Sequence, residues 1–165
     1  MKKFNKYLGY IENITGYILL TISCLAVLTQ LVSREIGGKS LIFTEEIAKF
    51  SYIWLVYICI ALGEHNREHF YVDIFVKFVK GKANLVLYTV EYLAGCLVFA
   101  YLFYWSIKFY AFEKVILSPA LEMSMSVVAL AVVVGIGLSL IHRTFKLVET
   151  INQIIHYSAE RTVEN

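Results

Sequence analysis

Long uncharged apolar stretches constrain this chain most. No charged residue occurs from 14 to 32 or from 50 to 63, and residues 123–141 form a third uncharged stretch. A fourth, at 85–107, is interrupted only by Glu91. A helix of about 19 residues, rising about 1.5 Å per residue, crosses most of a hydrocarbon core of about 30 Å. The sequence therefore predicts an all-α integral membrane protein with four transmembrane helices.

The composition agrees with this fold class and limits the partners. Hydrophobic residues make up 59% of the chain, the mean hydropathy is +0.66, and a single proline leaves long helices unbroken. The net charge of +2 and the scattered basic residues exclude a nucleic-acid partner and leave membrane lipid as the expected surroundings. Cys24, Cys59 and Cys96 each fall in an apolar stretch, which predicts buried free thiols rather than a disulfide or a metal site.

The apolar pattern defines a single membrane domain over residues 1–165. We expect transmembrane helices at residues 14–33, 47–63, 85–107 and 123–141. Residues 1–13 show helical spacing among polar residues and are interpreted as an interfacial lead-in, and an amphipathic interfacial helix is predicted at roughly 69–80. Beyond residue 141 a one-sided apolar pattern continues, so the last helix is expected to leave the membrane as an amphipathic tail.

Local signals mark the starts of two helices. Thr44 can cap the second one, and Glu45 and Glu46 then lie in its first turn, where the helix dipole favours negative charge. Lys49 lies within one turn of both carboxylates, so a helix-surface ion pair is expected. The Ser-Pro pair at 118–119 has the order of a cap followed by a first helical residue and predicts the start of the fourth helix.

Two patterns predict where the helices touch. Trp54 lies within the second span, away from the interfaces where membrane tryptophans gather, and its indole N–H requires an acceptor that lipid does not offer. The residues that share its helix face are Glu46, Phe50, Ile53 and Tyr57. A stripe of small residues, Ala131, Gly135 and Ser139, permits a close helix approach in the fourth span.

The distribution of basic residues predicts the orientation. Ten of the 15 Lys and Arg residues fall in the N-terminal segment, the connection between the second and third spans, and the C-terminal tail. The positive-inside rule places these segments, and with them both termini, in the cytoplasm.

The order of residues around the second span resembles a known family. An acidic pair precedes the span, a tryptophan lies inside it, and Arg-x-His-x-x-x-Asp follows its end, from Arg67 through His69 to Asp73. The sequence thus resembles the small membrane subunit of tripartite ATP-independent periplasmic (TRAP) transporters, the DctQ type. The matching positions are Glu45, Glu46, Ala48, Trp54, His69, Val72, Asp73 and the SPAL segment at 118–121.

This resemblance implies a scaffold rather than an enzyme. It implies a bacterial inner-membrane complex in which a large multi-span subunit carries substrate and sodium ions, and a periplasmic binding protein delivers an organic acid. Sialic acid and C4-dicarboxylates both remain open as the substrate. The small subunit would bind no substrate, metal or cofactor, and its motif residues, with Glu91, would serve structure or partner contact.

Two other functions are weighed against this interpretation. Glu91 is a carboxylate inside a span, which would suit a small proton-coupled four-helix exporter, although bonding to a neighbouring helix is the simpler role. His65 and His69 are four residues apart on one helix face and would suit a membrane haem or metal protein. The sequence offers them no obvious third ligand, so interfacial hydrogen bonding is favoured.

Overall fold

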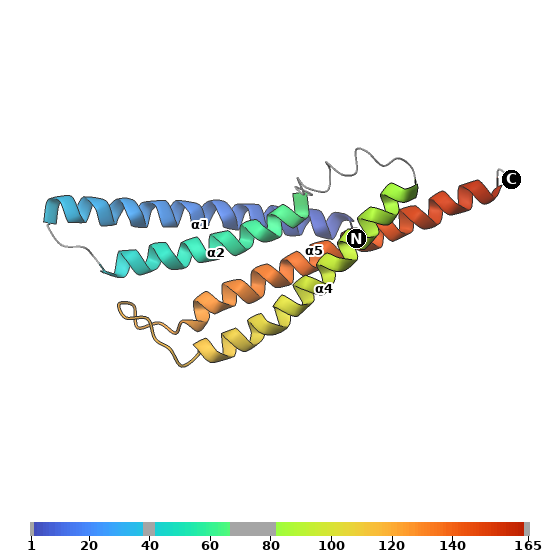
Figure 1. The fold of residues 1–165 in the computed structure, drawn as a ribbon. Coiled ribbons are helices and arrows are strands. Elements are labelled where there is room, and N and C mark those ends of the chain that lie inside the picture. The colour runs from blue at the N-terminus through green and yellow to red at the C-terminus, as the bar shows by residue number, and fades with distance from the viewer. Residues whose placement is uncertain (1, 38–41, 67–81, 164–165) are drawn as a thin grey trace.

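A computed structural model describes residues 2–37, 42–66 and 82–163. These residues form four long helices, α1 (Lys2–Gly37), α2 (Ile42–Asn66), α4 (Lys82–Glu113) and α5 (Ser126–Val163) (Figure 1). Each of the four is long and apolar enough to cross a membrane, and the described residues contain no strand beyond one isolated bridge. The predicted all-α membrane fold with four spans is confirmed.

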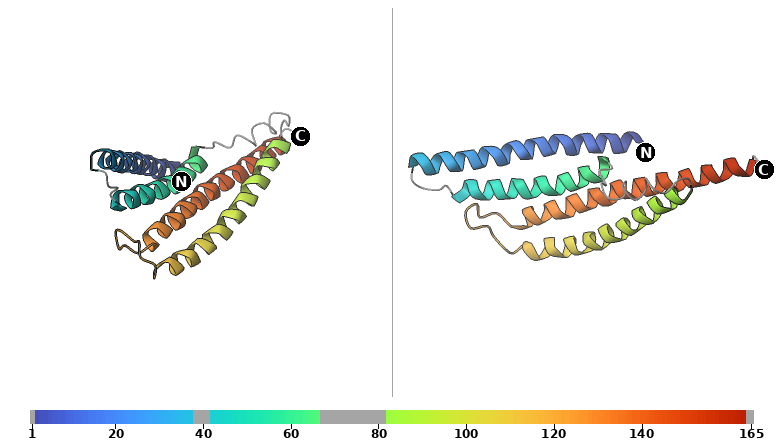
Figure 2. Two further views of the ribbon diagram at one scale, coloured as in Figure 1. Left: turned by 60° about the vertical axis from the view of Figure 1, so that its left-hand side comes forward. Right: turned by 45° about the horizontal axis from the view of Figure 1, so that its top comes forward.

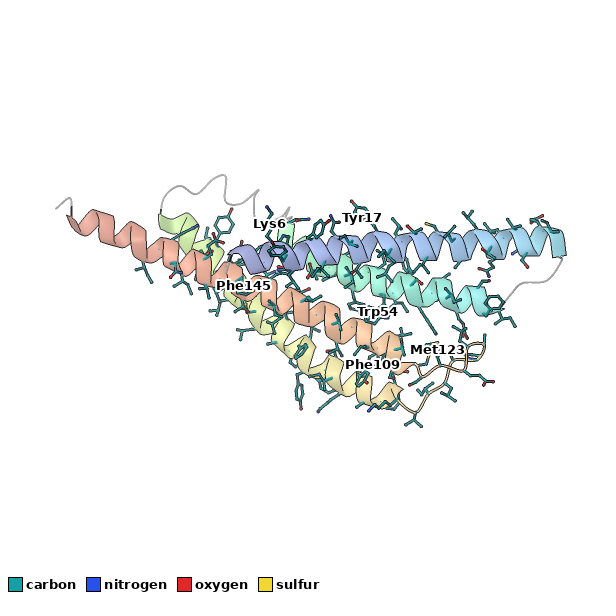
Figure 3. All side chains as sticks on the ribbon, turned by 180° about the vertical axis from the view of Figure 1, so that it is seen from behind. Lys6, Tyr17, Trp54, Phe109, Met123 and Phe145 are labelled. Atoms are coloured by element: carbon teal, nitrogen blue, oxygen red, sulfur yellow. The ribbon has the colours of Figure 1, made fainter. Side chains whose placement is uncertain are left out.

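The helices pack in one row in the order α1, α2, α5, α4. Both views in Figure 2 show α1 beside α2 and α4 beside α5, and the contact between α2 and α5 joins these two pairs. In the most apolar part of α5, 44% of the residues are buried within the chain, whereas in the most apolar part of α4 only 11% are buried. The row is thus open rather than a closed bundle, and it leaves apolar side chains such as Tyr17 uncovered (Figure 3).

Several helix boundaries differ from the prediction. α1 starts at Lys2, so residues 2–13 continue the first span as one helix instead of forming a separate lead-in. α5 starts at Ser126 and runs as one continuous helix to Val163, so it continues well beyond residue 141, where the predicted span ends. The predicted interfacial helix at 69–80 lies outside the described residues. The two ends of the chain lie at the same end of the row (Figure 1), and the cytoplasmic location of that end stays a prediction.

The connection from α4 to α5 corrects the predicted helix start at Ser118. Ser118 N donates to Met123 O over 2.8 Å, and Leu117 and Ser124 form a β-bridge, so the segment folds as a small hairpin. Glu122 has a φ of 51° at the turn. The cap of α5 is Ser124, whose Oγ accepts from Ser126 N over 3.3 Å. The Ser-Pro order was misleading because the pair forms the hairpin turn instead of a helix end.

The small-residue stripe lies where α5 meets α2. Ala131, Gly135 and Ser139 are all buried, and a Cβ added to Gly135 would lie 2.6 Å from both the Cβ and the carbonyl oxygen of Tyr57. A glycine at this position therefore lets the two backbones approach each other. The predicted close approach of the fourth span is confirmed, and its partner is α2.

The three cysteines are less buried than predicted. Cys24, Cys59 and Cys96 are free thiols as expected, but Cys24 and Cys59 are exposed and Cys96 is half-buried. The row explains this difference, because an apolar residue in an open row faces lipid more often than a protein interior.

The contact at Gly135 predicts a difference between two glycine substitutions. Gly135→Ala should lower stability by about 1–3 kcal/mol, because the added methyl meets the α2 backbone and must push the helices apart. Gly63→Ala is the matched control, since nothing lies within 4 Å of its added Cβ. The control should be neutral or gain up to about 1 kcal/mol from helix propensity. Thermal unfolding in detergent measures both, and equal effects would contradict the assigned contact.

Candidate functional site

Two groups of polar side chains lie at opposite ends of the row. The first, here called the Glu46 cluster, consists of Glu46 and residues 118–121 of the hairpin. The Glu46 carboxylate accepts from Ser118 Oγ over 2.6 Å, from Ala120 N over 3.0 Å and from Leu121 N over 2.9 Å. Bonds from two backbone amides and a hydroxyl to an ionised acceptor are among the stronger hydrogen bonds in proteins. Glu46 thus ties the start of α2 to the hairpin that leads into α5.

The two adjacent carboxylates have different partners. Glu45 pairs with Lys49 one turn along α2, at 2.5 Å and with both side chains largely exposed. This is the predicted helix-surface ion pair, and such pairs contribute little to stability. Thr44 was predicted to cap α2, but the helix already begins at Ile42, so Thr44 lies buried inside its first turn.

Trp54 joins the same two helices further along. Its Nε1 donates to the carbonyl oxygen of Val127 in α5 over 3.2 Å (Figure 3). The indole therefore has an acceptor in another helix of this chain. Glu46, Trp54 and Tyr57, which share one face by their spacing, all contact α5 or the segment that precedes it.

The second group, here called the Arg143 cluster, lies near the end of the row where both termini lie, and its residues come from all four helices. It consists of Asn5, Glu12, Glu64, His65, Glu91, His142, Arg143 and Lys146. At its centre, Arg143 of α5 donates from Nη1 to Glu64 of α2 over 2.7 Å, and from Nη2 to the carboxylate of Glu91 in α4. Lys146 Nζ donates to the carbonyl oxygen of Glu64. Removing one partner of such a buried pair typically costs about 3–5 kcal/mol. The guanidinium therefore connects the middle of the row to its α4 edge.

The surface of α4 is shaped to receive Arg143. A Cβ added to Gly95 would lie 1.9 Å from Arg143 Nε, so only glycine leaves room for the guanidinium at that point. Tyr92 and Phe99 lie on the same face, each with its ring centroid 5.8 Å from Arg143 Cζ, within the usual range of a cation–π contact.

The α1 side of the Arg143 cluster is built around His142, which is fully buried. Its Nε2 lies 2.8 Å from Glu12 Oε1, and its Nδ1 lies 2.6 Å from Asn5 Oδ1. The ring of His65 from α2 packs edge-on against it, with centroids 4.9 Å apart.

Sequence reasoning missed most of this cluster because it treated residues 142–150 as an amphipathic tail and did not consider their polar side as buried. The structure buries the polar side of α5, at Ser139, His142, Arg143, Lys146 and Thr150. In the predicted tail, the apolar residues Val148, Ile151 and Ile155 are exposed instead. The spacing of three and four between the polar residues was a usable signal for a buried polar stripe.

The remaining predicted site residues divide into two sets. Arg67, His69 and Asp73 lie outside the described residues, so their role in structure or partner contact stays a prediction. Glu91 is bonded to a neighbouring helix, which is the simpler of its two roles, and His65 packs on His142. Within the described part of the chain, no group of three or more His, Cys, Asp or Glu residues is arranged to hold a metal ion.

The fold and these contacts define a class of protein: a multi-pass helical membrane protein whose ionisable residues join its own helices. Comparison with protein families narrows this further. Residues 23–153 match the family described as tripartite ATP-independent periplasmic transporters, DctQ component, and the chain belongs to this family. It is therefore a TRAP transporter component, as its resemblance in sequence implied. No curated individual protein matches the chain.

Substituting each carboxylate of the acidic pair tests the Glu46 cluster. The decrease in melting temperature should be several times larger for Glu46→Gln than for Glu45→Gln. In Glu46→Gln an amide donor replaces one of the accepting oxygens and faces the backbone N–H groups. Glu45→Gln makes the same chemical change one residue away and disturbs only an exposed ion pair. Thermal unfolding of both variants in the same detergent makes the comparison, and similar decreases would contradict the role assigned to Glu46.

Proposed function

We propose that this chain is the scaffold subunit of a sodium-coupled importer of organic acids. It packs beside a large multi-span membrane subunit, which carries substrate and sodium ions, and a periplasmic binding protein delivers the substrate. Sialic acid and C4-dicarboxylates are the substrate classes considered. The complex lies in the bacterial inner membrane with both termini of this chain in the cytoplasm, and this chain itself binds no substrate or cofactor.

One observation carries the scaffold role: the buried ionisable side chains are used in contacts between the helices of this chain. Arg143 bonds Glu64 and Glu91, and His142 bonds Glu12. A subunit that moves ions or anions needs polar groups that face a passage and helices that are interrupted near the middle of the membrane. Here α2 and α5 are continuous, and their polar groups face neighbouring helices. This arrangement suits a rigid support better than a pathway.

The open row of helices supports packing against a larger membrane subunit. All four helices of the row carry exposed large apolar residues. In a bilayer these sides contact either lipid or another membrane protein, and a flat row offers a long apolar side to a larger subunit. Family membership and this shape both support the proposed association with the large membrane subunit.

Reconstitution tests the scaffold role directly. The chain purified alone and placed in liposomes should take up no organic acid, with or without a sodium gradient. Coexpression with its large subunit and binding protein should restore uptake, and the large subunit should copurify with this chain in mild detergent. Substrate flux through this chain alone would contradict the proposal.

The alternative function, a proton-coupled exporter that uses Glu91, makes a different prediction. Glu91→Gln keeps a hydrogen-bonding group near Arg143 but removes the charge, so a scaffold should show a lower yield of assembled complex with unchanged uptake per assembled complex. Glu35→Gln, which changes an exposed carboxylate at the far end of α1, is the control and should alter neither quantity. An exporter would instead lose all transport in Glu91→Gln, including the transport measured per folded protein. Transport per assembled complex separates the two functions.

A further inference from the structure

A group of aromatic side chains and one lysine lies on the exposed side of α4, toward its C-terminal end. Trp105 packs edge-on against two tyrosines, with its ring centroid 6.4 Å from that of Tyr101 and 6.1 Å from that of Tyr104. Lys108 extends its Nζ over two of these rings, 4.6 Å from the centroid of Tyr104 and 4.9 Å from that of Trp105. All four residues are exposed, and they are here called the Lys108 site.

The Lys108 ammonium has donors for which the described residues offer no acceptor. An ammonium group carries three N–H donors, and an aromatic face attracts its charge without providing a lone pair in return. In the part of the chain that the structure describes, the two rings are the partners of Lys108, and the carboxylates that form ion pairs do so with other residues. Because unsatisfied donors are costly in a membrane, Lys108 requires an acceptor from outside the chain.

The position of Lys108 along α4 sets the depth of the site in the membrane. The part of α4 that is long and apolar enough to cross a membrane ends at Glu113, about 7.5 Å beyond Lys108 along the helix axis. A lysine side chain can extend over much of this distance toward polar headgroups, and tryptophan and tyrosine gather at the same depth. Lipid phosphates are therefore within reach of the Lys108 ammonium.

Charge favours an anionic lipid as the source of the acceptor. A zwitterionic headgroup carries a cation of its own, and Lys108 already lies over the faces of Tyr104 and Trp105 that could bind such a cation. A protein partner is less suitable, because lysine is depleted at the centre of protein interfaces. An anionic phospholipid supplies a phosphate without a second cation, and lysine is a common ligand of phosphate groups.

We propose that the Lys108 site binds the phosphate of an anionic phospholipid. Lys108 donates to the phosphate oxygens, and the rings of Tyr101, Tyr104 and Trp105 pack against the glycerol and the upper acyl chains. The bound lipid covers the helix that the chain itself covers least, since only 11% of the most apolar part of α4 is buried. The site lies further along α4 than the residues that contact Arg143, so it is separate from the contacts that hold the helices together.

Quenching of tryptophan fluorescence by brominated lipids tests the proposal. The chain has two tryptophans, so Trp54→Phe leaves Trp105 as the only emitter. The full chain is placed in vesicles of equal parts phosphatidylglycerol and phosphatidylcholine, with bromine on the acyl chains of one lipid or the other. Phosphatidylglycerol should be enriched about fivefold beside Trp105, the factor expected for one lysine at an anionic surface. Equal quenching by the two lipids, or stronger quenching by phosphatidylcholine, would overturn the proposal.

Two lysine substitutions locate the effect. Lys108→Gln should bring the two lipids to equal quenching, because the glutamine amide carries no charge to attract a phosphate. Lys114→Gln is the matched control, since Lys114 also lies near a tyrosine at this end of α4, with its Nζ 5.7 Å from the Tyr110 centroid. This control should keep the preference for phosphatidylglycerol. A preference that is unchanged in Lys108→Gln would overturn the assignment.

Native mass spectrometry makes the same comparison if Trp54→Phe fails to fold. The chain with both tryptophans should retain bound phosphatidylglycerol, Lys108→Gln should lose it, and Lys114→Gln should keep it. If instead the chain shows no lipid preference and Lys108→Gln lowers the yield of copurified large subunit, Lys108 contacts protein and the proposal is overturned. The lipid readouts use this chain alone and involve no transport, so they are independent of the scaffold role.

Discussion

The structure depends most on one cation that is held between two helices. Arg143 extends from α5 to carboxylates on both neighbours, Glu64 on α2 and Glu91 on α4, and it is only 7% exposed. A guanidinium has five donors in a fixed planar arrangement, so it can satisfy two carboxylates at once where a lysine cannot do so with the same geometry. In a membrane, where water is excluded, an unpaired Arg143 would be strongly destabilising. The ion pairs of Arg143 therefore fix α2, α4 and α5 relative to one another.

The Glu46 cluster and the Arg143 cluster hold the open row together at its two ends. A closed bundle is held by a shared interior, but here α1 contacts chiefly α2, and α4 contacts chiefly α5. Lipid provides little hydrophobic driving force between helices, so close packing at small residues and interhelical hydrogen bonds hold them together. Gly135 supplies the close approach between α2 and α5, and the Glu46 and Arg143 clusters fix the two ends of that contact. A row fixed at both ends is well suited to serve as a rigid support.

The same arrangement shows what the buried ionisable residues of the described helices contact. Glu12, Glu64, Glu91, His142, Arg143 and Lys146 all belong to membrane-length helices, and the hydrogen bonds described for them join these helices to one another. Ionisable residues inside a membrane protein usually mark a pathway, but mutual pairing between helices is the other way to lower their cost. In this chain that pairing connects α1, α2, α4 and α5.

The sequence by itself determined the number of spans, the helical fold and the family, because length and hydropathy alone decide whether a segment can cross a bilayer. It also indicated two contacts, at Trp54 and at the stripe around Gly135, since an indole N–H and a row of small residues each require a particular kind of neighbour. Only the tertiary structure decided which residues meet. The sequence did not show that Arg143 would be buried, because its burial depends on Glu64 and Glu91, which are 79 and 52 residues away. Ser118 resembled a helix cap because local sequence cannot show that its hydroxyl donates a hydrogen bond to Glu46, which is 72 residues earlier. Periodicity reports which residues share a face, and the partner of that face is set by how the helices are ordered in space.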